Sequence, residues 1–397
     1  MNKIHLFFCC CMLLVSSCAK YMDFPVTENG RFVEVLKENT FGFSYMIESI
    51  KSIYPSLDES QFSKVIRLLD TSASVTSTAI SYLTRDPRGN EILASGLIMR
   101  PADGKSKGLL LFLPSAKVDK SNVGSETLMT FEGVLSFFGY TVIIPDLLGY
   151  GVSKQVEYPF LFSENTARVA YDMHISAAEY FGTKGIPFPR EVTLGGYSMA
   201  GMGVVSLHRY IEQNDPGNII IRESITGGGI YDLGLAVDIF SKIKYCASPT
   251  VPLIFKSMDY WYNLNIDYNE VFIDPLLSNM GEWLDGTHSR DEMMTFIPHD
   301  MTTYMHPDFF TKEKNASLRK IDSCLRLHSA AKGWAPQSPL TLIHSRDDDM
   351  APPAIAQYTY ENLLKAGGNI SLIWGSGDHL THGVEYYLAM MAYLLAR

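Results

Sequence analysis

Short apolar segments alternate with segments of helical periodicity between residues 108 and 226, and this alternation constrains the fold more than any other feature. Four apolar segments predict strands, at 108–113, 140–144, 192–194 and 219–226. The segments between them predict helices, at 127–138, 164–181 and 201–210. Strands that are apolar along almost their whole length are typical of a parallel sheet covered by helices on both faces. The sequence therefore predicts an α/β fold with a mostly parallel central sheet.

A hairpin and a helical preface are expected before this sheet. Residues 75–84 and 91–99 predict two strands joined by the turn Asp86-Pro87-Arg88-Gly89-Asn90, whose residues favour the backbone angles of a turn. Upstream, apolar residues follow helical spacing in 41–54 and 60–69. We therefore expect the chain before the hairpin to consist of a tether and N-terminal helices.

The pentapeptide Gly196-Tyr197-Ser198-Met199-Ala200 lies between a predicted strand and a predicted helix. A serine on such a tight turn projects its hydroxyl away from the sheet, and the small residues Gly196 and Ala200 let the backbone bend sharply. Taken alone, a glycine-rich turn with an idle serine fits the pentapeptide equally well. Ser198 is therefore a candidate nucleophile that needs partners elsewhere in the chain.

Candidate partners follow two later strands. The apolar segment 339–343 is followed by three adjacent aspartates, Asp347 to Asp349, and the segment 370–374 is followed by His379. A histidine can take the proton of a serine hydroxyl when a carboxylate orients its ring. His382 lies three residues further on, but His379 is closer to the strand end, in the short glycine-rich loop, and is the favoured base.

With these residues in place, the chain resembles the secretory lipase family of the α/β-hydrolases over most of residues 78–394. The resemblance includes Pro145-Asp146-Leu147-Leu148-Gly149-Tyr150-Gly151, the Ser198 turn, and the run from Trp334 to Pro352. It implies an α/β-hydrolase fold with an inserted helical cap and the hydrolysis of esters. The family pattern His-Gly-x-x-Asp-x-x-Val-Pro implies Asp348 as the acid, although Ser345 and Ala351 depart from that pattern.

Ester hydrolysis also needs backbone donors for the oxyanion. One is expected to be the N–H of Met199, directly after the nucleophile. The other is expected from the loop after the strand at 108–113, where Pro114 has no N–H and leaves Ser115 or Ala116. Many relatives carry His-Gly in this loop, and this chain does not.

About 110 residues separate the strand ending near residue 226 from the strand that precedes the aspartates, far more than an ordinary crossover needs. This stretch is rich in aromatic residues and methionine, so we expect a helical cap whose large side chains mostly form its own core. The resulting organisation is a signal peptide at 1–17, a tether with helices at 18–70, a core at 71–228 and 338–397, and a cap at 229–337.

The N-terminus predicts the cellular compartment. Lys3 is followed by an apolar run, and Val15-Ser16-Ser17-Cys18 resembles a bacterial lipobox, in which Cys18 becomes the lipidated first residue. We therefore expect a lipid-anchored protein of the bacterial cell envelope, with an ordinary secretory signal as the alternative. Beyond the signal, Cys246 and Cys324 could form a disulfide or remain free, buried thiols.

Composition narrows the partners. The formal charge of −10 argues against a nucleic-acid partner, and no convincing metal, phosphate or dinucleotide motif is present, so no cofactor is expected. The favoured function is a carboxylic ester hydrolase acting on small-molecule, lipid or carbohydrate esters. A prolyl-type serine peptidase remains an alternative, which would need a pocket for proline and often an acidic recess for a free amine. The cap offers acids such as Asp259 and Glu270, but their spacing does not single them out. A non-catalytic surface binding lipoprotein on a hydrolase scaffold is the third.

Overall fold

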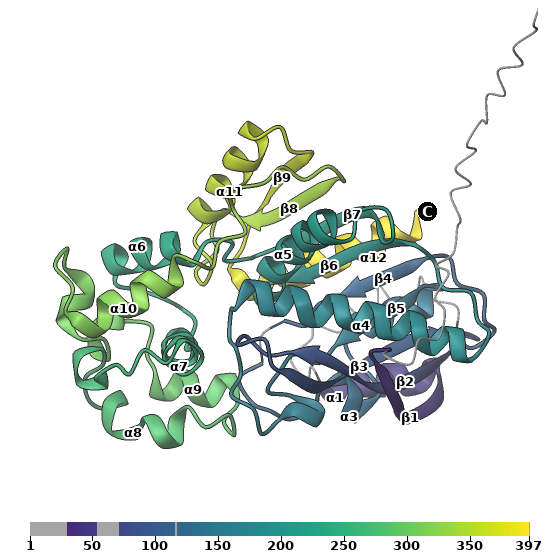
Figure 1. The fold of residues 1–397 in the computed structure, drawn as a ribbon, viewed down its shortest axis with the longest axis horizontal. Coiled ribbons are helices and arrows are strands. Elements are labelled where there is room, and N and C mark those ends of the chain that lie inside the picture. Colours follow the sequence, from purple (N-terminus) through teal and green to yellow (C-terminus); the bar gives the residue numbers. More distant parts are fainter. Residues whose placement is uncertain (1–29, 54–70, 116, 397) are drawn as a thin grey trace, which may run out of the picture.

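A nine-stranded sheet runs through the computed structural model of this chain, which describes residues 30–53, 71–115 and 117–396 (Figure 1). Its strands are β1 Phe32–Gly42, β2 Ser74–Arg85, β3 Glu91–Pro101, β4 Leu109–Phe112, β5 Thr141–Pro145, β6 Glu191–Tyr197, β7 Ile220–Gly227, β8 Leu340–Ser345 and β9 Ile370–Gly375. The spatial order is β1-β2-β3-β5-β4-β6-β7-β8-β9. β1, β2, β3 and β5 pair antiparallel in that order, and every pair from β5 to β9 is parallel. The predicted mostly parallel sheet is confirmed.

Helices cover both faces of the sheet. In β4, Leu109 and Leu111 belong to one buried cluster and Leu110 and Phe112 to another, as expected when successive side chains point to opposite faces. The first cluster includes side chains of α4 Ser163–Thr183, α5 Met199–Asn214 and α11 Pro353–Lys365. The second includes side chains of α1 Phe43–Ile53, the 3-10 helix η1 Glu132–Phe138 and α12 His379–Leu395.

Two predictions for local structure were wrong. Residues 32–42 form the edge strand β1, not a tether, and the continuous helix predicted at 127–138 is broken. That region consists of α3 Gly124–Thr127, a left-handed Leu128 with φ 59°, and η1. β1 is exposed along most of its length, so it lacks the apolar signal of a buried strand. The helix predicted at 60–69 lies outside the described residues.

The start of β1 is fastened to α4. Glu179 Oε2 accepts hydrogen bonds from the backbone N–H groups of Arg31 and Phe32, both at 2.7 Å. The Arg31 guanidinium also pairs with Asp172, a fully buried carboxylate of α4 that accepts a hydrogen bond from the Thr84 hydroxyl at 2.8 Å. The chain is therefore held to the body of the protein from residue 31 onward.

The segment between β7 and β8 forms a lobe of helices beside the sheet (Figure 1). Its helices are α6 Leu233–Ile243, α7 Val251–Tyr262, η3 Tyr268–Glu270, α8 Leu276–Trp283, α9 Arg290–Phe296, η4 Met301–Thr303, η5 Pro307–Phe310 and α10 Ala316–Leu325. Most of its large apolar side chains are buried, and they belong to the same buried cluster as the face of the sheet covered by α4, α5 and α11, so the inserted helical cap does not have a separate core. Cys246 and Cys324 are both buried and free, so they do not form the disulfide that the sequence left open.

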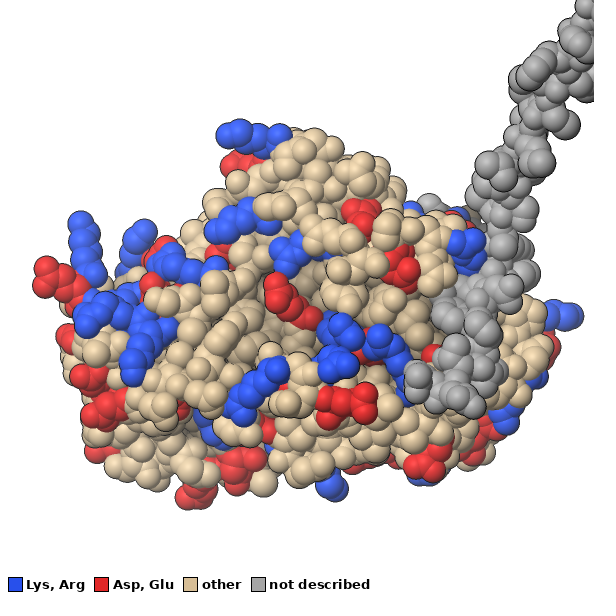
Figure 2. Space-filling model, in the orientation of Figure 1, with Lys and Arg blue, Asp and Glu red and all other residues tan. Residues whose placement is uncertain are grey.

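The surface carries charges of both signs. Figure 2 shows lysine and arginine side chains interspersed with aspartate and glutamate on the visible face, over the cap and the core alike. Within the described ranges, no helix has the length and apolar character needed to cross a membrane.

Candidate active site

Ser198 occupies a sharp turn between β6 and α5. Its backbone has φ 64° and ψ −126°, a conformation that residues other than glycine rarely adopt and that costs about 1–3 kcal/mol. Its N–H donates to the Gly227 carbonyl at 2.9 Å, which fixes the turn against β7. A Cβ on Gly196 would lie 2.7 Å from Ala200 Cβ, so a larger residue does not fit there. The predicted tight turn between a strand and a helix, with a glycine required at position 196, is therefore confirmed.

His379 reaches back over this turn. Its Nε2 lies 2.8 Å from Ser198 Oγ, and its Nδ1 faces Asp348. Contrary to the prediction, His379 is not in a loop: it is the first residue of α12, which Asp378 caps by accepting a hydrogen bond from the Thr381 N–H at 2.8 Å. The helix begins early because this cap is available directly after the glycine-rich turn.

Tyr197 holds the backbone of His379. The Tyr197 hydroxyl donates to the His379 carbonyl at 2.7 Å, and the two rings lie 5.1 Å apart. Burial raises the pKa of Tyr197, so the hydroxyl keeps its proton and remains a donor. The residue before the nucleophile therefore positions the histidine.

Asp348 is the aspartate that meets the imidazole. Its Oδ2 and Oδ1 lie 2.8 and 3.0 Å from His379 Nδ1, and Oδ1 also accepts the N–H groups of Met350 at 3.0 Å and Ala351 at 2.7 Å. Burial pushes the pKa of Asp348 upward, but the hydrogen bond and charge of His379 outweigh it and hold the pKa below its ordinary value. The carboxylate is therefore ionised and fully oriented.

The neighbouring aspartates serve the backbone. Asp347 Oδ2 accepts the Gly377 N–H at 3.3 Å, and Asp349 Oδ1 accepts the His379 N–H at 3.2 Å. Both stabilise the backbone at and just before the start of α12 without contacting the ring nitrogens of His379. Successive residues leaving β8 point in different directions, which leaves Asp348 alone to meet the imidazole.

The structure does not bring His382 to the serine. His382 is buried against Gly375, where an added Cβ would lie 2.1 Å from the ring, and its Nδ1 lies 3.4 Å from Glu385. Of the two histidines left in competition by the sequence, His379 is therefore the one at the site.

Sequence reasoning assigned no role to His344. This fully buried residue of β8 donates from Nε2 to the Ala351 carbonyl at 2.8 Å and lies 3.6 Å from Asp348 Oδ2. Desolvation lowers the pKa of His344, which favours the neutral ring. The sequence signal for this contact was the spacing of four residues between His344 and Asp348. The end of β8 and the turn after it bring two residues at that spacing together.

Two of the expected oxyanion donors, Met199 and Ser115, lie at or beside the turn. Met199 is the first residue of α5, where a helix N–H has no acceptor within the helix and is free to bind an anion. The Ser115 hydroxyl donates to the Tyr197 carbonyl at 3.2 Å, which places residue 115 beside the nucleophile. The alternative donor, Ala116, lies outside the described residues.

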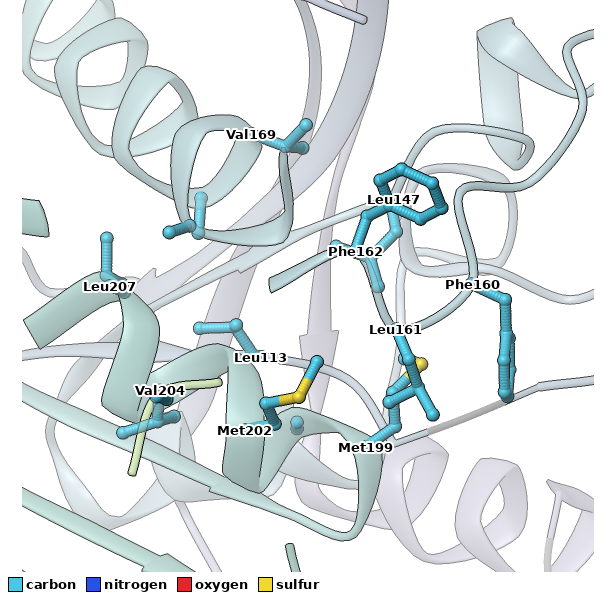
Figure 3. Packing of buried hydrophobic residues seen from close by; sticks show 14 of the residues in the cluster. Leu113, Leu147, Phe160, Leu161, Phe162, Val169, Met199, Met202, Val204 and Leu207 are labelled. Atoms are coloured by element: carbon cyan, nitrogen blue, oxygen red, sulfur yellow. The ribbon is translucent and has the colours of Figure 1, made fainter. Parts of the chain in front are cut away.

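An apolar cluster surrounds the base of the site. Figure 3 shows Met199, Met202, Val204 and Leu207 of α5 together with other members of the cluster, including Leu161. Met199 is 8% exposed.

In the described part of the chain, no group of three histidine, cysteine or acidic side chains has the arrangement of a metal site.

Neither a protein-family model nor the sequence of a curated protein matches this chain. Solved structures do resemble it. A Legionella pneumophila protein provisionally described as a hydrolase superposes with a TM-score of 0.75 at 19% identity, covering 91% of this chain and 97% of its own. A ligand-bound form of the rice cell wall degrading esterase LipA from Xanthomonas oryzae gives 0.71 at 20% identity, with 91% and 96% covered.

A more distant match is the closed state of Candida antarctica lipase A, with a TM-score of 0.58, 12% identity, and 92% of this chain and 83% of that chain covered. At these identities the likeness concerns the fold. Together with the strand order, it shows that this chain has the α/β-hydrolase fold with a helical cap inserted after β7.

Proposed function

We propose that the protein is a serine carboxylic ester hydrolase that works through an acyl-enzyme. The observation that carries this proposal is the imidazole of His379, which bridges Ser198 Oγ at 2.8 Å and the Asp348 carboxylate at 2.8 and 3.0 Å. These three residues come from three separate strand ends. A serine, a base and an orienting acid in this geometry are the parts that nucleophilic acyl transfer requires.

The reaction follows from these contacts. Neutral His379 takes the Ser198 proton at Nε2 while Oγ attacks the ester carbonyl carbon, and Asp348 stabilises the imidazolium that forms. His379 then gives this proton to the leaving alcohol as the carbonyl of the acyl-enzyme re-forms. Water, deprotonated by the same histidine, attacks the acyl-enzyme and releases the acid. The N–H groups of Met199 and of Ser115 or Ala116 are the proposed donors to the oxyanion in both steps.

The proposed substrates are esters of lipids or carbohydrates. Of the similar structures, one is described as a cell wall degrading esterase and another as a lipase, and these two descriptions support the two proposed substrate classes. The cap is rich in methionine and aromatic residues, whose adaptable side chains suit an acyl chain or a ring.

The two cap carboxylates that a prolyl-type peptidase could use to bind a free amine, Asp259 and Glu270, are hydrogen-bonded within the cap. Asp259 accepts hydrogen bonds from the Ile266 N–H at 3.2 Å and the Tyr268 hydroxyl at 3.0 Å, and Glu270 accepts the Ser317 N–H at 3.0 Å. Both carboxylates therefore have structural partners within the cap. This engagement favours an ester over a peptide with a free amine.

A fluorophosphonate probe followed by two substrates tests the proposal. We expect covalent labelling of the protein, hydrolysis of p-nitrophenyl butyrate, and no hydrolysis of a proline amide. Labelling with cleavage of the amide alone would identify a peptidase. The absence of both labelling and turnover would identify a binding protein. If the butyrate ester is hydrolysed, a series of esters with different acyl lengths separates a lipase from an esterase.

We also propose that the protein is anchored in the bacterial cell envelope by lipid on Cys18. The supporting observation is the run Val15-Ser16-Ser17-Cys18 after an apolar segment. Cys18 lies outside the described residues.

Replacing Cys18 with alanine is expected to move the protein from the membrane to the soluble fraction, because lipid is the proposed attachment. Fractionation of cells that express the wild type and Cys18→Ala measures this directly. Cys246→Ala serves as a matched control, since this buried thiol lies in the cap, and it should stay with the membrane. Membrane association of Cys18→Ala equal to that of the wild type would exclude the anchor.

A further inference from the structure

The cap helix α7 is seated on the core segment 157–162, which we call the aromatic loop. Lys256 of α7 pairs with Glu157 at 3.3 Å, and its Nζ also donates to the Leu284 carbonyl at 3.0 Å. The rings of Tyr158 and Phe160 lie 5.1 Å apart in an edge-to-face arrangement. The loop connects the core to the start of α4, so it belongs to the core by sequence but contacts the cap.

One cap hydroxyl fixes the backbone of this loop. Ser257 of α7 is 1% exposed, and its Oγ accepts the Phe160 N–H at 2.9 Å and donates to the Tyr158 carbonyl at 3.0 Å. The Phe160 N–H also donates to the Tyr158 carbonyl at 2.8 Å, so the buried hydroxyl ties this tight turn to the cap. The position of the aromatic loop therefore depends on a residue of the cap.

The aromatic loop in turn contacts the residue that follows the nucleophile. The Tyr158 hydroxyl lies 2.7 Å from Met199 Sδ, and the ring of Tyr158 packs edge-to-face against the ring of Tyr150, with their centroids 4.8 Å apart. A methionine side chain has three rotatable bonds and adopts many shapes unless a neighbour fixes it. Tyr158 thus fixes the side chain of the residue that directly follows Ser198.

We propose that Ser257 is a positioning residue, which acts from the cap through Tyr158 on Met199 and so shapes the wall against which the ester lies during attack. This inference rests on the proposed ester hydrolysis. Loss of the Ser257 hydroxyl frees the aromatic loop, and the loosened Met199 side chain then lets the bound ester depart from the geometry of attack. Such misplacement lowers the rate of the bound complex more than it lowers binding.

Steady-state kinetics with p-nitrophenyl acetate test the proposal, because so small an ester makes little demand on access through the cap. We expect Ser257→Ala and Tyr158→Phe each to lower kcat about tenfold, with KM changed less than twofold. The double variant should lose no more than either single variant, because both changes break the same chain of contacts. Ser241→Ala is the matched control, since this serine of α6 donates within its own helix, to the Asp238 carbonyl, and should keep the wild-type kcat.

A crystal structure of Ser257→Ala tests the contact without any turnover. The Tyr158 hydroxyl should be displaced from Met199 Sδ. Failure of the proposed function is seen separately, as a wild-type protein that does not hydrolyse esters. An unchanged Tyr158–Met199 contact, an increase in KM with kcat intact, or losses that multiply in the double variant would each overturn the positioning role.

Discussion

Ser198→Ala is expected to lower the turnover of p-nitrophenyl butyrate at least about a thousandfold while the protein stays folded. The substitution removes the proposed nucleophile and the hydroxyl 2.8 Å from His379 Nε2. It leaves the Ser198 N–H bond to the Gly227 carbonyl in place, so the turn keeps its support. Initial rates measure the loss, and circular dichroism with thermal unfolding checks the fold.

Ser206, about two turns into α5, the helix that follows Ser198, provides the control. Ser206 is 2% exposed, and its hydroxyl makes no hydrogen bond to the described residues. Ser206→Ala should therefore keep the wild-type rate. Substantial turnover by a folded Ser198→Ala protein would remove Ser198 from the reaction.

The second large effect separates three adjacent carboxylates. Asp348→Asn is expected to lower kcat by about a thousandfold to ten thousandfold, because an amide can neither stabilise the imidazolium nor hold the tautomer that presents a bare Nε2 to the serine. Asp347→Asn and Asp349→Asn should cost far less, since an asparagine oxygen can still accept the N–H groups of Gly377 and His379. All three changes remove one negative charge, so their comparison isolates position.

The kcat values of the three variants, measured near neutral pH, decide the assignment. Asp348 has a pKa below its ordinary value, so it is charged throughout that range and pH does not confuse the comparison. A larger loss in Asp347→Asn or Asp349→Asn than in Asp348→Asn would show that another carboxylate orients the histidine.

The features that sequence predicted well are those fixed by burial or by local sterics. Strands β4 and β5 are almost entirely apolar because both of their faces are buried, and this requirement can be read from the sequence. The turn at Ser198 needs a residue without a side chain at Gly196, which the close approach to Ala200 explains. Asp348, in contrast, came from the register of a resembling family, because three neighbouring aspartates are equivalent in the sequence alone.

The features that sequence missed depend on contacts between distant segments. β1 is stable as an edge strand because β2 pairs with it and Glu179 fixes its start, and neither partner is near it in sequence. The helix predicted at 127–138 is broken because Leu128 adopts a left-handed backbone conformation. A glycine at this position would have indicated such a conformation, but leucine does not. Ser257 lies 59 positions from Ser198 in the sequence, and only the folded structure places its hydroxyl against the loop that contacts Met199.

The attachment of Arg31 and Phe32 to α4 limits how far a lipid-anchored molecule could move from the membrane. We call the segment between Cys18 and Arg31 the leash. Its ends are 13 positions apart, and an extended chain spans about 3.5 Å per residue, so the leash measures at most about 45 Å. The leash is attached at one edge of the sheet, because β1 is its outermost strand. The active site of an anchored enzyme would reach no further from the membrane than this length plus the distance across the folded body from β1 to Ser198. Cutting the leash between residues 18 and 30 would release the intact body to soluble substrates.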